Sequence, residues 1–85
     1  MKALILISDT GDIIGGFLPD SESLSSNIIS AIKEYLAPEK VASVTNLPFA
    51  LDMEHYETRK IKAITLDEDG DRFRHDFTLT KTKLI

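Results

Sequence analysis

The fold of this chain is decided by residues 59–83, which read RKIKAITL, then DEDGD, then RFRHDFTLTKTK. The first and third pieces are rich in β-branched and aromatic residues, and apolar and polar residues alternate along them as in half-buried strands. Asp69-Gly70 between them is the preferred dipeptide of a two-residue type I′ turn. The stretch therefore predicts a long β-hairpin, with strands from Arg59 to Leu66 and from Arg72 to about Lys83.

A two-residue turn at this position also fixes the expected register of the hairpin. The expected pairs are Asp67 with Arg72, Leu66 with Phe73, Thr65 with Arg74, Ile64 with His75 and Ala63 with Asp76. One face then carries mostly apolar residues, namely Ile64, Leu66, Phe73, His75, Phe77 and Leu79. The other face carries polar residues, namely Thr65, Asp67, Arg72, Arg74, Asp76 and Thr78. The opposite charges of Asp67 and Arg72 support this register.

A continuous apolar run, Ala3 to Ile7, predicts a strand inside the sheet that is buried on both faces. Turn residues follow at positions 8–12, and a second apolar run covers positions 13–18, so the two runs predict another hairpin. Gly15 and Gly16 in its second strand indicate a bulge, or a place where something packs against bare backbone.

A helix is predicted next, with Asp20 and Ser21 as candidate N-caps and Pro38 as its end. Its apolar residues recur at helical spacing, at Leu24, Ile28, Ala31, Ile32, Tyr35 and Leu36. Residues 41–45 predict a third strand by their β-branched content. Residues 48–57 favour a short helix, with an extended segment as the alternative.

These elements predict a single α+β domain over residues 1–85, in the order ββαβ(α)ββ. We expect an antiparallel sheet of about five strands, with one long amphipathic helix packed on one face. Cysteine is absent from the sequence, so neither a disulfide nor a thiolate metal cluster supplements the core.

Charge is unevenly distributed along the chain. The net charge is −4, which disfavours a generic nucleic-acid binder, because such proteins need an excess of cations to attract phosphates. Residues 1–57 carry three bases and nine acids, whereas residues 58–85 carry seven bases and five acids. The apolar start is too short for a signal peptide or a membrane span, so we expect a cytoplasmic protein.

Two short motifs resemble known sites but fit turns better. Asp9-Thr10-Gly11 resembles the active-site tripeptide of aspartic proteases, yet the apolar pair and glycine that those enzymes place far downstream follow at once here. Asp67, Asp69 and Asp71 alternate like calcium ligands, but Gly70 precedes the third acid instead of following it. If the two hairpin tips lie at one end of the sheet, Asp9 and Asp12 join this acid cluster, and the alternative is a weak cation site or an acidic docking patch.

Neither histidine indicates a catalytic or metal site. His75 is expected in the core with a satisfied hydrogen bond, and His55 has no second histidine at ligand spacing. The serines lack a glycine-flanked nucleophile turn, and the glycines form no phosphate loop. We therefore expect no enzyme activity, no cofactor and no metal.

The segment Gly16-Phe17-Leu18-Pro19-Asp20, between a hairpin and a helix, resembles the opening of small antitoxins built on a truncated RNase H-like domain. That resemblance implies a role in binding a partner protein. The second half of the chain departs from the family pattern, because it has a long Asp-Gly hairpin and no DNA-binding appendage, so the chain is not assigned to the family.

The leading functional hypothesis is a small acidic protein that binds another protein, as an inhibitor, immunity factor, antitoxin or phage-type regulator. We expect the C-terminal strand to be a sheet edge that adds to a partner's sheet or to a second copy, forming a homodimer. The candidate partner-binding residues are Arg72, Arg74, Thr80, Lys81, Thr82, Lys83, Leu84 and Ile85. The alternative is an RNA- or DNA-contacting module, whose candidate residues are Arg59, Lys60, Lys62, Arg72, Arg74, Lys81 and Lys83.

Overall fold

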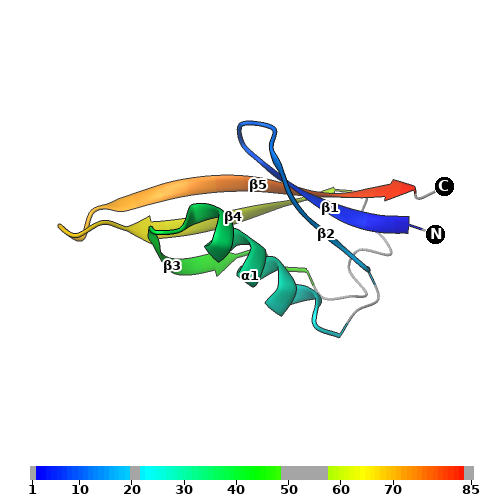
Figure 1. Cartoon of the computed structure of the whole chain (residues 1–85), viewed down its shortest axis with the longest axis horizontal. Helices are drawn as coiled ribbons and strands as arrows, with labels where there is room; N and C mark the ends of the chain where they lie inside the picture. The colour runs from blue at the N-terminus through cyan, green and yellow to red at the C-terminus, as the bar shows by residue number, and fades with distance from the viewer. Residues whose placement is uncertain (1, 20–21, 49–57, 84–85) are drawn as a thin grey trace.

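The computed structural model describes residues 2–19, 22–48 and 58–83. One helix packs on one face of an antiparallel five-stranded sheet (Figure 1), which confirms the predicted α+β fold. The elements are β1 (Lys2–Ser8), β2 (Ile13–Phe17), α1 (Leu24–Leu36), β3 (Lys40–Thr45), β4 (Thr58–Leu66) and β5 (Arg72–Lys83). The helix has 13 residues, so it is shorter than the long helix that we expected. The predicted second helix falls mainly on residues 49–57, which lie outside the described residues.

The strand order is β2-β1-β5-β4-β3, so β5 is the central strand. The prediction of a C-terminal edge strand is wrong, because Thr80 pairs with Ile5 of β1 on one side and with Thr58 of β4 on the other. The apolar run of β1 lies antiparallel to β5 along its whole length, from Lys2 opposite Lys83 to Ser8 opposite Phe77. The edges of the described sheet are β2 and β3.

The predicted register of the β4–β5 hairpin is wrong by one residue. Leu66 pairs with Arg72, and the loop closes where the Asp67 amide donates to the Asp71 carbonyl at 3.1 Å. A type I′ turn needs positive φ at both Asp69 and Gly70, but only Gly70, with φ of 82°, has it. The result is a three-residue loop with glycine in the left-handed position, which adds one residue to the turn.

The first hairpin uses the same loop. The Ser8 amide donates to the Asp12 carbonyl at 2.8 Å, and Gly11 has φ of 92°. In both loops the side chain of the first residue accepts a hydrogen bond from the backbone amide of the fifth residue. The Asp12 amide donates to Ser8 Oγ at 3.0 Å, and the Asp71 amide donates to Asp67 Oδ1 at 2.8 Å. Asp9-Thr10-Gly11 is therefore part of a β-hairpin loop, as its turn chemistry predicted.

The shifted register changes the faces of β4. Ile61, Ala63 and Thr65 lie on the face covered by α1, called the helix face, and are at most 1% exposed. Ile64 and Leu66 lie on the opposite face with Arg72 and Arg74, where we did not expect them. A one-residue slip has this effect because successive side chains of a strand point to opposite faces.

The core lies between α1 and the helix face of the sheet. Helix positions four residues apart form one buried stripe: Leu24, Ile28, Ile32 and Leu36. The strands supply Leu4, Leu6, Ile61, Ala63, Phe77 and Leu79. The ring of Tyr35 meets that of Phe77 edge-on, with centroids 6.1 Å apart. The N-cap position is Ser23, not the predicted Asp20 or Ser21. No helix in the described part of the chain has the length and apolar character needed to cross a membrane.

Candidate interaction surface

Two polar side chains on the helix face of the sheet, Thr65 and His75, have partners within the chain. Thr65 is 1% exposed, and its hydroxyl lies 2.9 Å from His75 Nε2. That same nitrogen is 3.7 Å from a Glu39 carboxylate oxygen. His75 thus has the hydrogen-bonded, partly buried position expected of a structural histidine. It lies beside Ala63 and not beside Ile64, because of the shifted register.

The opposite face, called the distal face, is apolar over β1 and β2. On β1 its residues alternate with the buried Leu4 and Leu6, and on β2 Gly16 pairs with Ile5 and Ile13 pairs with Ile7. They are Ala3, Ile5, Ile7, Ile13 and Gly16, and this set is named the apolar half. Ile5 and Ile7 are partly exposed, and Ile13 is 70% exposed. Residues 3–7 are therefore inside the sheet as predicted, but buried on one face only.

The same distal face is basic over β4 and β5. Cross-strand pairing places four bases there, Lys60, Lys62, Arg72 and Arg74, and this set is named the basic half. Asp76 is the acid among them, and its carboxylate lies 2.9 Å from Arg74 Nε. Lys60 Nζ donates to Thr78 Oγ1 at 3.0 Å, which holds this lysine across the sheet. The basic half is notable because the chain as a whole carries a net charge of −4.

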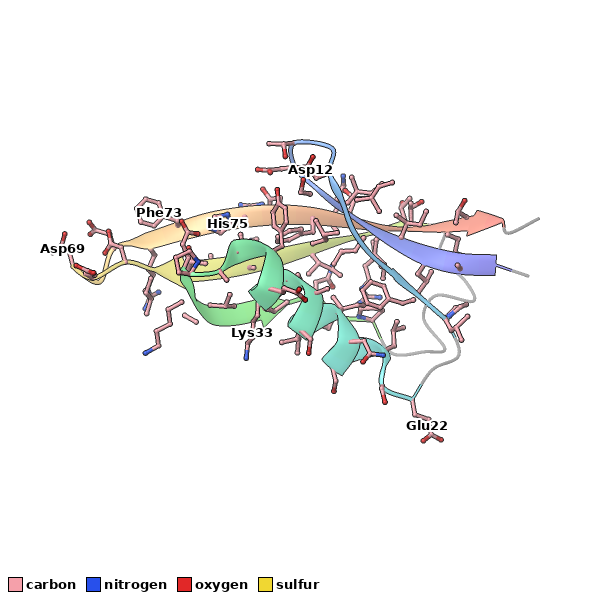
Figure 2. All side chains as sticks on the ribbon, in the orientation of Figure 1. Asp12, Glu22, Lys33, Asp69, Phe73 and His75 are labelled. Atoms are coloured by element: carbon pink, nitrogen blue, oxygen red, sulfur yellow. The ribbon has the colours of Figure 1, made fainter. Side chains whose placement is uncertain are left out.

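Apart from Asp76, several acidic residues of the described part lie at the ends of the hairpins and of the helix and not on the distal face. Figure 2 shows Asp69 at the tip of the β4–β5 hairpin, Asp12 at the turn between β1 and β2, and Glu22 beyond the start of α1. Charge is thus separated by region, and separated charges of this kind give a protein a preferred orientation when it meets a partner.

The two neighbouring glycines of β2 have different explanations. A Cβ at Gly15 would lie 2.7 Å from the Phe17 ring, so this glycine makes room for a core side chain. A Cβ at Gly16 would meet nothing closer than the Leu4 carbonyl oxygen at 3.9 Å, and its φ is not positive. The predicted close packing on bare backbone is thus present at Gly15, while the chain itself gives no steric reason for Gly16. The register also shifts between Leu6 and Ile7, as expected for a bulge in this hairpin.

The predicted partner-binding residues are only partly brought together. Arg72, Arg74, Thr80 and Thr82 share the distal face by alternation along β5. Lys81 lies opposite Leu4, on the helix side of the sheet. The backbone of Lys83 pairs with Lys2, whereas Leu84 and Ile85 lie outside the described residues. No sequence pattern indicated that Ile5, Ile7 and Ile13 would join them, because that needs the strand order.

The predicted nucleic-acid set is also divided between the faces. Arg59 lies opposite the buried Leu79 and donates from Nε to the Asn46 carbonyl at 2.8 Å, so it links β4 to the residue that follows β3. The sequence placed the arginines and phenylalanines of β5 on opposite faces, and the structure confirms this. Phe73 and Phe77 lie on the helix face, so they do not provide stacking beside Arg72 and Arg74.

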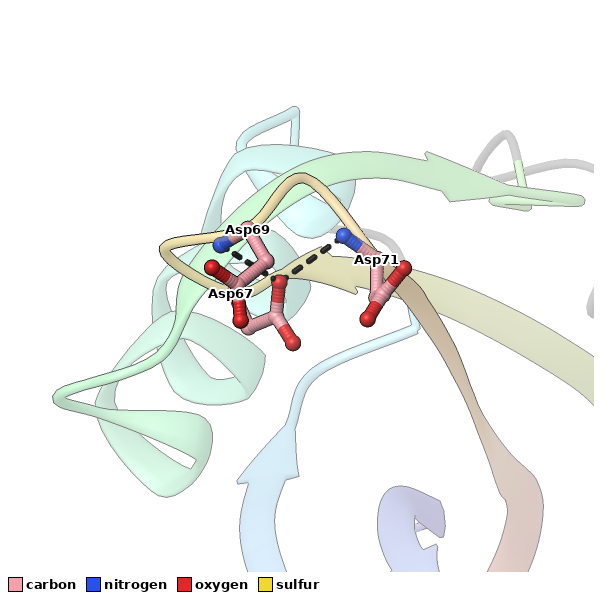
Figure 3. A group of neighbouring side chains, drawn as sticks. All are labelled: Asp67, Asp69 and Asp71. Carbon is pink, nitrogen blue, oxygen red and sulfur yellow. Dashed lines mark hydrogen bonds between the residues drawn. The ribbon is translucent and has the colours of Figure 1, made fainter.

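The three aspartates at the hairpin tip form an exposed cluster (Figure 3), with ligand atoms within 4.8 Å of one another. Asp67 Oδ1 already accepts the amides of Asp69 and Asp71, at 2.9 and 2.8 Å, so this carboxylate stabilises the turn. An extension through Asp9 and Asp12 required the two hairpin tips to lie together, and they do not. Ser8 pairs with Phe77, and six residues of strand, about 20 Å, separate that level from Asp71.

No family model, curated protein or solved structure matches the chain.

Proposed function

We propose that this chain is a non-enzymatic protein-binding module, and that it recognises its partner with the distal face of its sheet. Roles that such a module serves include inhibitor, immunity factor, antitoxin and phage-type regulator. The proposal keeps the predicted class of function but moves the binding surface from the C-terminal edge to a sheet face.

The observation that carries the proposal is the one-sided burial of β1. Its sequence is apolar at five successive positions, a pattern typical of strands covered on both faces. The structure buries Leu4 and Leu6 under α1, while Ile5 and Ile7 lie on the face with the exposed Ile13. A partner protein would provide the second cover, because contiguous apolar surface of this kind is typical of interaction sites.

Gly16 supports a close approach at the same place. It lies on the distal face opposite Ile5, and neither steric crowding nor backbone conformation requires glycine there. Glycine inside a strand is unfavourable by roughly 0.5–1 kcal/mol relative to alanine, so a compensating role is expected. Close contact with another chain is one such role.

The basic half would complete the interface. An apolar centre with charged residues around it is the usual plan of a protein interface, and arginine is enriched there. The complementary surface is an apolar patch bordered by carboxylates. The four bases would orient that partner and speed its association at low salt.

A nucleic-acid module is the second candidate, and the clustering of Lys60, Lys62, Arg72 and Arg74 on one face is what favours it. The apolar half favours the protein partner, because β1 and β2 place isoleucines and not bases next to the basic half. The two candidates differ in salt dependence. Binding to phosphates falls steeply with salt, by a slope set by the number of contacts.

The test is affinity capture from a nuclease-treated lysate with three baits: the unaltered chain, Lys62→Glu and Lys33→Glu. The two variants change charge equally, but Lys62 lies on the distal face and Lys33 on the helix, on the other side of the sheet (Figure 2). We expect the same protein to be retained by the unaltered chain and by Lys33→Glu, and lost with Lys62→Glu. Equal retention by all three baits would contradict the proposal. Loss of all capture after nuclease treatment would favour the nucleic-acid module.

A further inference from the structure

The two edges of the described sheet are guarded differently against pairing with another strand. Both edge strands have a register shift against their neighbour, but β3 also begins with Lys40, a charge of the kind that discourages strand addition. β2 contains Ile13, Ile14, two glycines and Phe17, with no lysine, arginine or proline. It has β1 as a neighbour on one side and no described strand on the other. The β2 edge therefore lacks the charges that commonly guard such strands.

A pocket of about 280 Å³ lies beside this edge, between β2 and α1. Its lining residues are Asp12, Ile13, Ile14, Ala31, Glu34 and Tyr35. Two of them are acids and none is a base, and Asp12, Glu34 and Tyr35 are all exposed. A side chain that projects from a strand added to β2 toward the helix would enter this pocket, because alternate residues of a strand point to one face.

The carboxylate of Asp12 is held in place at the mouth of the pocket. Tyr35 donates its hydroxyl to Asp12 Oδ2 at 3.1 Å, and Thr10 donates to the same oxygen at 3.2 Å. Tyr35 is in turn packed against Phe77, so the aromatic ring and the carboxylate form a fixed pair. A carboxylate beside an aromatic ring suits the ammonium group of lysine or the guanidinium of arginine.

We propose that the β2 edge and the adjoining pocket bind an extended basic segment of a partner protein by strand addition. The main chain of the segment would pair with β2, and its lysine or arginine side chains would lie between Asp12 and Glu34. Its remaining side chains would face the apolar half. This is the peptide-recognition mode in which backbone hydrogen bonds give affinity and alternate side chains give specificity.

Charge complementarity selects this occupant over a second copy of the chain. Two copies joined edge to edge through β2 would each bring Asp12 and Glu34 toward the shared interface, and like charges oppose that contact. The charged pocket is separate from the basic half, which lies on the distal face of β4 and β5, so the inference goes beyond the proposed function although both use the apolar half. The tests remain distinguishable, because the capture experiment changes Lys62 and the peptide titration reports on β2 and Glu34.

The probe is a nine-residue peptide, TVKVTVKVT, whose lysines fall on one face of a strand and whose valines fall on the other. Its control is TVEVTVEVT, which has equal strand propensity and the opposite charge. Titration of each into the isotope-labelled chain, followed by amide NMR, measures both affinity and location. We expect TVKVTVKVT to bind at least about tenfold more tightly than its control, with amide shifts in Ile13–Phe17.

Glu34→Lys tests the charge of the pocket without altering the core, because Glu34 is exposed on α1. We expect it to weaken TVKVTVKVT binding by about fivefold or more, whereas the matched change Glu22→Lys, outside the pocket, leaves affinity unchanged. Equal affinity for the two peptides, shifts confined to β3, or no shift at millimolar peptide would overturn the proposal. A dimer in light scattering whose β2 amides are already protected would also overturn it, in favour of a second copy.

Discussion

On the helix face of the sheet, Leu4, Leu6, Phe77 and Leu79 are at most 2% exposed, whereas Ile13 on the distal face is 70% exposed. Both faces carry isoleucine or leucine on β1, so the sequence pattern of this strand does not distinguish them. The difference comes from α1, which covers one face only. The comparison separates residues that hold the fold from residues that are available to a partner.

The largest expected effect is a loss of stability on the helix face. Ile28→Ala removes a side chain that is 0% exposed, and it should lower the free energy of unfolding by about 3 kcal/mol through lost burial and a cavity. Ile13→Ala, on the distal face and 70% exposed, should change it by less than about 0.5 kcal/mol. Urea denaturation of both variants measures the contrast. Similar losses would mean that the distal face also belongs to the core.

The adjacent glycines of β2 sharpen the comparison within one strand. Gly15→Ala should cost about 1–2 kcal/mol, because the new Cβ would lie 2.7 Å from the Phe17 ring. Gly16→Ala should leave stability unchanged or raise it by up to about 1 kcal/mol, since the position is open and its φ is ordinary. Thermal unfolding distinguishes the two. The proposed function further predicts that Gly16→Ala weakens partner binding. Unchanged binding by this variant would contradict the close approach of a partner at Gly16.

A smaller effect is expected at the hydrogen-bonded pair on the helix face. Thr65→Val removes the hydroxyl that lies 2.9 Å from His75 Nε2, and it should lower stability by about 1 kcal/mol. Thr78→Val on the distal face is the matched control, and should change stability by less than about 0.5 kcal/mol because that position is partly exposed. Equal effects in urea denaturation would show that the buried bond contributes no more than the bond that Thr78 accepts from Lys60.

The smallest expected effect on stability is that of Lys62→Glu. Its side chain lies on the distal face, so the free energy of unfolding should change by less than about 0.5 kcal/mol. The same variant should nevertheless lose most partner binding, through repulsion of an acidic partner surface. A melting curve and a binding titration on one sample separate the two effects. A large loss of stability would contradict the exposed position of this side chain, and weaker binding would then be explained by unfolding.

Local pattern was sufficient to predict the elements, but not how they pair. The helix, both hairpins and the third strand follow from apolar spacing and from turn residues, which act over a few positions. The strand order does not, because the pairing of β1 with β5 joins residues 69 to 81 positions apart, from Ser8 with Phe77 to Lys2 with Lys83. For that reason the prediction that the C-terminal strand is a sheet edge was wrong. The distal surface was not predicted either, because it depends on the same strand order.

The hairpin register failed on a single turn type. Asp-Gly suits a type I′ turn. However, the side chains of Asp67 and Ser8 each accept a hydrogen bond from the backbone amide four residues later. This hydrogen bond favours the three-residue loop with a left-handed glycine. A polar acceptor three residues before glycine, present in both hairpins, is the sequence signal that would have given the correct faces of β4.

The most direct test of distal-face recognition is site-specific photocrosslinking. A benzophenone side chain is placed at Thr78, which lies on the distal face between the apolar and basic halves, or at Ser26, which is exposed on α1. The distal-face proposal predicts a covalent adduct with a partner protein from Thr78 and none from Ser26. An adduct from Ser26 alone would place recognition on the helix and contradict it.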